Sequence, residues 1–206
     1  MNRACLTKNT NLHEQNQHAS SIPPIIYNFI RMKSYFKNII LIITLVLLIA
    51  GCKKNYAISE KQAILFQYDY INYAWGYQHN GFLIDSAGNV LTYSNPEGWN
   101  FPDKDFEISE VEMKENIDSC QQSGKKIPRE ELKKYSHYID NIALSKITAL
   151  KNVAADAGTS EFICYHFSEN NGMYKGYLIK KEGDFTCENL NFFSKKVATW
   201  MRDINK

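Results

Sequence analysis

Residues 162–180 read FICYHFSENNGMYKGYLIK, and this stretch predicts how the chain folds. Two runs rich in aromatic and β-branched residues, 162–167 and 174–180, flank the turn sequence Asn-Asn-Gly at residues 170–172. Asn-Gly between two such runs is the strongest short-range hairpin signal, because both residues accept positive φ angles. The C-terminal third is therefore predicted to contain an antiparallel hairpin.

A second group of strands is predicted near the start of the folded part. Residues 64–75 alternate in a period-2 pattern that puts Phe66, Tyr68 and Tyr70 on one side of a long strand. Short strands at residues 82–84 and 90–93 follow around a Gly-containing turn. Together they predict an N-terminal meander.

Helices are predicted between and after these strands. Residues 108–121 form the first, and a second starts with Pro128 at its first position and keeps an apolar stripe through Ile142. Its pattern allows it to continue, or to kink and restart, and to end near Gly158. The last helix is predicted to begin with Asn189 as N-cap.

The resulting order is strands, helices, strands and helix, with hairpins instead of βαβ crossovers. This predicts an α+β domain, an antiparallel sheet made of the N-terminal meander and the C-terminal hairpin, with about three helices packed on one face.

Residues 38–52 read NIILIITLVLLIAGC and follow the basic residues Arg31, Lys33 and Lys37. The apolar run is too short to cross a bilayer as a helix, and its length and flanks are typical of a secretory signal peptide. Its ending, Ile49-Ala50-Gly51-Cys52, resembles the lipobox of bacterial lipoproteins. The resemblance implies cleavage before Cys52 and acylation of that residue, and so a membrane partner through a lipid anchor.

The same segment divides the chain. We expect translation to start at Met32 instead of Met1, which makes residues 1–31 a non-native extension or an unstructured leader. Residues 32–51 are the predicted signal peptide, 52–60 a polar tether and 61–206 one globular domain. Lys53 and Lys54 do not resemble an inner-membrane retention signal, so we expect the outer membrane of the cell envelope.

The net charge of the chain changes once the predicted signal peptide is removed. Of 24 Lys and Arg, five lie in residues 1–51, and of 22 acidic residues one does, so residues 52–206 carry 19 basic and 21 acidic residues. A chain of net charge about −2 with interspersed signs has no basic stripe for phosphates, and we expect no nucleic-acid partner.

Three cysteines remain in the domain: Cys120, Cys164 and Cys187. In an oxidising compartment we expect a Cys164–Cys187 disulfide and a buried, inert Cys120. The alternative is a zinc site or thiol–imidazole pair formed with His166, which shares a strand face with Cys164. No C-x-x-C spacing supports it, and we expect neither a metal nor a cofactor.

Tyr73, Trp75, Tyr77 and His79 cluster where the first strand meets its loop. Flat rings with polar atoms suit a surface that binds a protein or a glycan, whereas packing beneath a helix would equally use such residues. Both interpretations stay open, and exposure of these rings distinguishes them.

Catalytic motifs for hydrolases, nucleotide-binding enzymes and zinc proteases are absent from the sequence. We therefore predict no catalytic residues and a non-catalytic envelope lipoprotein that binds a protein or a glycan. The alternative is a small envelope hydrolase that uses Asp69 or His79.

Overall fold

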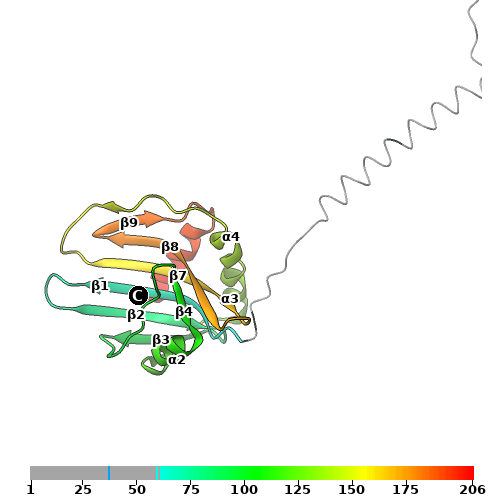
Figure 1. Cartoon of the computed structure of the whole chain (residues 1–206), viewed down its shortest axis with the longest axis horizontal. Helices are drawn as coiled ribbons and strands as arrows, with labels where there is room; N and C mark the ends of the chain where they lie inside the picture. Colours follow the sequence, from blue (N-terminus) through cyan, green and yellow to red (C-terminus); the bar gives the residue numbers. More distant parts are fainter. Residues whose placement is uncertain (1–36, 38–58, 60) are drawn as a thin grey trace, which may run out of the picture. The chain divides into compact units, whose positions relative to one another are not determined.

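The strands of residues 61–206 pair into one antiparallel sheet (Figure 1). The structure is a computed structural model that describes residue 37, residue 59 and residues 61–206. The predicted leader, the lipobox with Cys52 and nearly all of the predicted signal peptide and tether lie outside the described residues.

Nine strands form the sheet in this described part, in the order β5-β3-β2-β1-β7-β8-β9-β6, with β4 paired to β8 beside this path. Their bounds are β1 Ile64–Asn72, β2 Gln78–Asp85, β3 Asn89–Ser94, β4 Glu107–Ser109, β5 Gln121–Lys126, β6 Lys151–Asn152, β7 Thr159–Ser168, β8 Met173–Gly183 and β9 Phe185–Glu188.

Both predicted strand groups are present, and β1 joins them. On one side Tyr68 of β1 pairs with Phe82 of β2, and on the other it pairs with Phe162 of β7. The predicted turn between β7 and β8 contains Gly172 at φ +65°. The meander and the hairpin are therefore neighbours at the centre of one sheet, which confirms the predicted α+β class.

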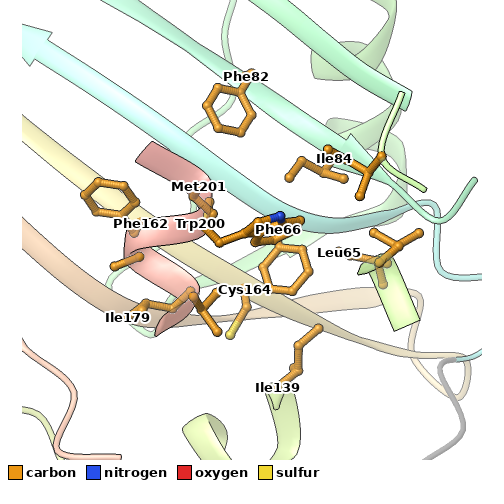
Figure 2. Close-up of a cluster of buried hydrophobic side chains, with 14 of the residues drawn as sticks. Leu65, Phe66, Phe82, Ile84, Ile139, Phe162, Cys164, Ile179, Trp200 and Met201 are labelled. Atoms are coloured by element: carbon orange, nitrogen blue, oxygen red, sulfur yellow. The ribbon is translucent and has the colours of Figure 1, made fainter. Parts of the chain in front are cut away.

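Three helices, α3 Arg129–Ser136, α4 Ile139–Ala143 and α5 Ser194–Ile204, pack on one face of the sheet. Figure 2 shows the core they form with the strands. Phe66 of β1 meets Trp200 of α5 edge-on, with ring centroids 5.2 Å apart. Burial of each such aromatic or aliphatic side chain contributes about 2 kcal/mol relative to exposure.

The other face carries a second core around β4 and helix α2, Glu110–Asp118. Helix α2 begins with a capping box in which Ser109 and Glu112 bond to each other's backbone amides. Its Met113 is fully buried against this face. The side chains of β2 and β7 alternate between the two cores as a period of two requires. In β1 the register shifts between Ile64 and Phe66, so that Leu65 and Phe66 both enter the core beneath α3, α4 and α5.

Two helix boundaries differ from the prediction, and each difference has a tertiary cause. The helix from Pro128 onward takes the kinked form that the pattern allowed, as α3 and α4, but it ends at Ala143 and not near Gly158, because residues 144–153 bond to β9 and its neighbours. The last helix begins at Ser194 and not directly after Asn189. The Asn189 side chain donates to the carbonyl of Ile142 and accepts from the Ser194 hydroxyl, so it does not cap a helix that starts at residue 190.

Candidate functional site

The tight turn between β1 and β2 exposes three aromatic rings. Tyr73 is 74% exposed, Trp75 81% and Tyr77 48%. The Tyr73 and Tyr77 ring centroids lie 5.5 Å apart. We call these three residues the aromatic tip. Core packing, one of the two interpretations left open by the sequence, is therefore wrong for them.

The base of the tip is fixed by Asn72, the last residue of β1. Its Oδ1 accepts a hydrogen bond from the amide of Ala74 at 2.8 Å. Its Nδ2 donates to the Tyr70 hydroxyl at 3.1 Å, and that hydroxyl donates to the carbonyl of Ala157 at 3.1 Å. Gly76, at φ +96°, then reverses the chain at an angle that other residues rarely adopt. The rings thus project from a braced turn.

His79 does not belong to this surface. It is fully buried in β2, where it pairs with Ile71, and its side chain enters the core of the α2 face. The prediction that His79 forms part of the exposed aromatic group is therefore wrong. Its ring centroid still lies 6.3 Å from that of Tyr77, so it supports the tip from beneath.

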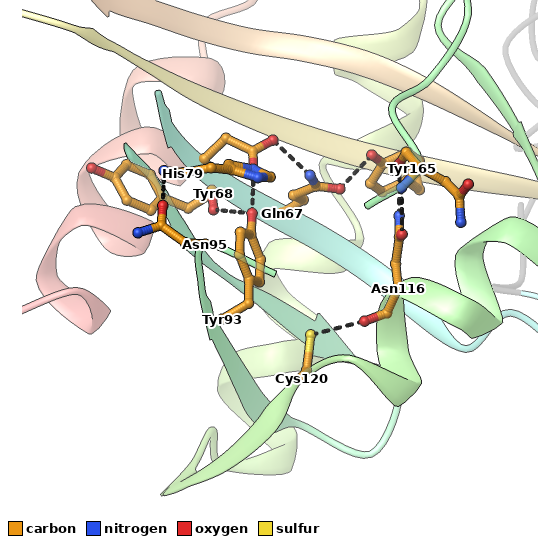
Figure 3. A network of polar contacts seen from close by, with 10 residues as sticks. Gln67, Tyr68, His79, Tyr93, Asn95, Asn116, Cys120 and Tyr165 are labelled. Carbon is orange, nitrogen blue, oxygen red and sulfur yellow. Dashed lines mark hydrogen bonds and ion pairs between the residues drawn. The ribbon is translucent and has the colours of Figure 1, made fainter. Parts of the chain in front are cut away.

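Figure 3 shows the buried polar network that His79 joins, with Gln67, Tyr93 and Tyr165. The network centres on the carboxylate of Asp69. The Nε2 atom of His79 lies 3.0 Å from Oδ1 of Asp69, and Gln67 Nε2 donates to Oδ2 at 2.6 Å. The Tyr93 hydroxyl also contacts Oδ1, and the Tyr165 hydroxyl donates to Oε1 of Gln67 at 2.6 Å. These donors compensate for burying the carboxylate.

The tyrosines of this network stay protonated. Burial raises the pKa of Tyr93 well above its usual value, and the charge and hydrogen bond of Asp69 raise it further. Burial and then the charge of Asp69 also raise the pKa of Tyr165. A protonated phenol can donate to an acceptor, so both residues keep the network bonded.

Aromatic rings of the loop after β3 cover the network. The Trp99 and Phe101 ring centroids lie 5.4 Å and 5.1 Å from that of His79. Two buried nitrogens, His79 Nδ1 and Trp99 Nε1, have no hydrogen-bond partner among the described residues. Since His79 and Asp69 are almost inaccessible, the pair stabilises the sheet and offers no surface to a substrate.

A pocket of about 430 Å³ adjoins the aromatic tip. Tyr73 and Phe185 contribute rings to its lining, and Glu161, Lys181 and Asp184 contribute charges. The Glu161 and Lys181 side chains form an ion pair at 2.5 Å, while Asp184 accepts hydrogen bonds from the amides of residues 157 and 158, in the loop before β7. Nothing in the sequence pattern indicates Phe185, because it comes to line the same pocket as Tyr73 only through the pairing of strands.

The predicted Cys164–Cys187 disulfide is not formed. Both residues are free thiols, as is Cys120. Cys164 lies in the core beneath α3, α4 and α5, whereas Cys187 lies in the core of the opposite face. The sheet itself separates the two sulfurs, so the prediction fails on geometry.

The zinc alternative fails for the same reason. His166 shares a face with Cys164 but pairs with Asp140 of α4 at 2.7 Å, and Cys187 is on the other face. Within the described part of the chain, no group of three His, Cys, Asp or Glu residues is arranged to hold a metal ion. That part also contains no helix long and apolar enough to cross a membrane.

No family model, curated protein or solved structure matches this chain. Its function must therefore be inferred from the residues and geometry described above.

Proposed function

We propose that this chain is a bacterial envelope lipoprotein, held at the membrane by acyl chains on Cys52, whose domain binds a protein or a glycan and catalyses no reaction. The aromatic tip carries the proposal. Three large rings projecting from one turn have a hydration cost that burial against a partner would remove. Their phenol and indole groups can also donate hydrogen bonds to that partner.

The bracing of the tip supports binding more than chance exposure. Asn72 and Tyr70 tie the turn to residues 156–157, and His79 packs under Tyr77. A surface that is rigid before binding loses less conformational entropy on association. The adjoining pocket, with the Tyr73 and Phe185 rings in its lining, can accept a group that projects from the ligand.

The direction of β1 suits a tethered binding domain. The chain enters this strand at Ile64 and leaves it at Asn72, so the nine residues place the tip about 30 Å along the sheet from the point of entry. An anchor on Cys52 would attach to the entry end. The tip would then be displaced from the tether.

Capture from envelope extract tests the binding site. Full chain carrying Trp75→Ala plus Tyr77→Ala should lose a ligand that the wild type captures, while Val111→Ala, which truncates an exposed apolar side chain on α2, should retain it. Protease treatment of the extract removes a protein ligand and spares a glycan. Equal capture by the wild type and a stably folded double variant would exclude the tip.

Mass spectrometry of the mature N-terminus tests the anchor separately. The proposal expects an acylated Cys52 as first residue, and Cys52→Ala should leave an unprocessed, unacylated chain. An unmodified amine at another residue would refute the lipoprotein assignment without affecting the tip.

Only one observation supports the hydrolase alternative, the contact between Asp69 and His79. Carboxylate–imidazole pairs do serve as general bases. Here both residues are buried, and the carboxylate already bonds to Tyr93 and Gln67. The geometry therefore favours the binding function.

A further inference from the structure

Two segments lie side by side along the β6–β9 side of the sheet: residues 144–153 and residues 189–196 (Figure 1). The amide of Leu190 donates to the carbonyl of Lys146 at 2.9 Å. The amide of Thr148 donates to the carbonyl of Glu188, also at 2.9 Å. Asn191 Nδ2 donates to the carbonyl of Asn141 at 2.9 Å. These bonds hold the two segments in one continuous surface.

Apolar side chains concentrate on this surface. Among the described residues, six of the twelve exposed large hydrophobics belong to these two segments: Leu144, Ile147, Leu150, Val153, Leu190 and Phe192. Leu144 is 83% exposed and Phe192 74%. We call these six residues the apolar edge. Half of the exposed large hydrophobics among the described residues thus lie on two hydrogen-bonded segments, and such a concentration of apolar exposure marks a surface that another body covers.

Lysines flank the apolar edge without any acidic residue in either segment. Lys146, Lys151, Lys195 and Lys196 are all exposed, and residues 144–153 and 189–196 contain no Asp or Glu. None of the four ammonium groups forms an ion pair with a described residue, and Lys196 Nζ lies 4.9 Å from the Phe192 ring centroid. Two acidic residues border the segments: Glu188 is exposed beside Thr148, and Asp184 lies beside Val153. The four lysines outnumber these two carboxylates, so the surface carries a local excess of positive charge on a domain whose overall charge is slightly negative.

We propose that the apolar edge docks on an anionic phospholipid bilayer. Its aliphatic side chains and Phe192 enter the boundary between headgroups and acyl chains, and the lysines contact lipid phosphates. Apolar residues interleaved with lysines are the composition by which proteins lie in that boundary. Each lysine near an anionic surface adds attraction.

A bilayer fits this surface better than a second copy of the chain. In a two-fold dimer the same patch would face itself, which would bring its uncompensated lysines toward one another. The neighbouring strand β6 has only two residues and offers little backbone for pairing with another strand. The charge pattern instead complements an anionic lipid surface. This proposal is independent of the aromatic tip.

Photo-crosslinking in vesicles tests the docking directly. Full chain with p-benzoylphenylalanine in place of Leu190 is reconstituted in phosphatidylcholine alone, or in phosphatidylcholine mixed with phosphatidylglycerol. The matched control carries the same group in place of Val111, an exposed aliphatic residue on α2 of the opposite face. We expect lipid adducts at position 190, few at position 111, and a higher yield with phosphatidylglycerol.

Charge variants then test the lysines. Lys195→Glu plus Lys196→Glu should lower the adduct yield at position 190 about fivefold or more. The acidic residues would lie in the first turn of α5, where the helix dipole favours negative charge, so the fold should persist. Lys104→Glu plus Lys126→Glu, which change exposed lysines of the loop before β4 and of β5, should leave the yield unchanged.

Three results would overturn the proposal. Equal lipid adducts at positions 190 and 111 would mean that tethering alone brings lipid to the domain. Adducts of position 190 with a second copy or with another protein would replace the bilayer by that partner. Absence of any adduct from protein that retains its native melting transition would exclude docking at this edge.

Discussion

The imidazole Nε2 of His79 lies 3.0 Å from Oδ1 of Asp69, and both side chains are buried between the sheet and the loop that follows β3. The pairing of β1 with β2 brings these two side chains together. Asp69 pairs with Gly81 and Ile71 pairs with His79 across β1 and β2. The two pairs are two positions apart, so the side chains of Asp69 and His79 share a face of the sheet. A contact between residues ten apart in sequence thus links the central strands to the base of the aromatic tip.

The first prediction is that Asp69→Ala destabilises the domain by about 3 kcal/mol or more. The change leaves the Nε2 atoms of Gln67 and His79 buried without their acceptor. Urea denaturation of the full chain, followed by near-ultraviolet circular dichroism, measures the loss. Asp118→Ala is the control, because Asp118 forms only an exposed pair with Lys114 and should cost less than about 1 kcal/mol. Similar losses in both variants would mean that the network does not stabilise the fold.

A second prediction concerns Gly81, which lies opposite Asp69. A Cβ atom there would collide with the carbonyl oxygen of Tyr68 and the ring of Tyr93. Gly81→Ala should therefore destabilise the domain by about 2 kcal/mol or more, because the clash involves backbone in a packed core. Gly98→Ala, in open space at φ +67°, should cost only about 1 kcal/mol of backbone strain. Thermal melting compares the two, and a larger loss at Gly98 would contradict the structure.

Local patterns were sufficient to predict the central sheet. The alternation of Phe66 and Tyr68, and the Asn-Gly turn ending at Gly172, act over a few residues and need no knowledge of partners. Both predicted strand groups occur at the expected positions. The join between β1 and β7 was not predictable, because it pairs residues almost a hundred positions apart.

The remaining elements depend on such distant contacts. Strand β5 has the polar sequence QQSGKK and becomes a strand by pairing with β3. Residues 144–153 have helical apolar spacing, yet the backbone of Lys146 and Thr148 bonds to the segment beside β9. In both cases tertiary pairing overrides local propensity.

The candidate site was predictable only in part. The clustering of Tyr73, Trp75 and Tyr77 predicts the site, and the structure exposes all three. His79 belongs to the same cluster in sequence, but β2 begins at Gln78 and carries His79 into the core, which the sequence does not show. Phe185 carried no signal at all, since β8 and β9 bring it to the pocket beside Tyr73.

A third prediction concerns pH and the pair of Glu182 with Arg202. Partial burial by itself raises the pKa of Glu182, but hydrogen bonds and charges from Lys180 and Arg202 outweigh it and hold the pKa below its usual value. A carboxylate whose pKa is lower in the folded chain adds stability above its unfolded pKa, near 4.5, and loses it as the pH falls through the folded value. Arg202→Met should therefore cost up to about 1 kcal/mol at pH 7 and progressively less below pH 4.5.

Urea denaturation at a series of pH values checks this dependence. Methionine keeps apolar contact where the Arg202 guanidinium lies 5.5 Å from the Phe162 ring centroid, so packing changes little. Lys206→Met is the control, because its partner Asp203 is exposed and the pair should add almost nothing. A cost of Arg202→Met that is the same at pH 3 and pH 7 would show that the ion pair does not contribute.

The last prediction concerns the three thiols of the domain. Burial, and then the charge of Asp69, raises the pKa of Cys120 to about 12, and burial also raises the pKa of Cys164 and Cys187. Because the thiolate is the reacting species, we expect Cys120 and Cys164 to be alkylated about a hundredfold or more slowly at pH 7 in the native chain than in urea, and Cys187 to be alkylated more slowly as well. Peptide mapping after alkylation, without reduction, should recover each as an unbridged cysteine. Rapid labelling of native Cys120, or a bridge between Cys164 and Cys187 across the sheet, would contradict the packing described here.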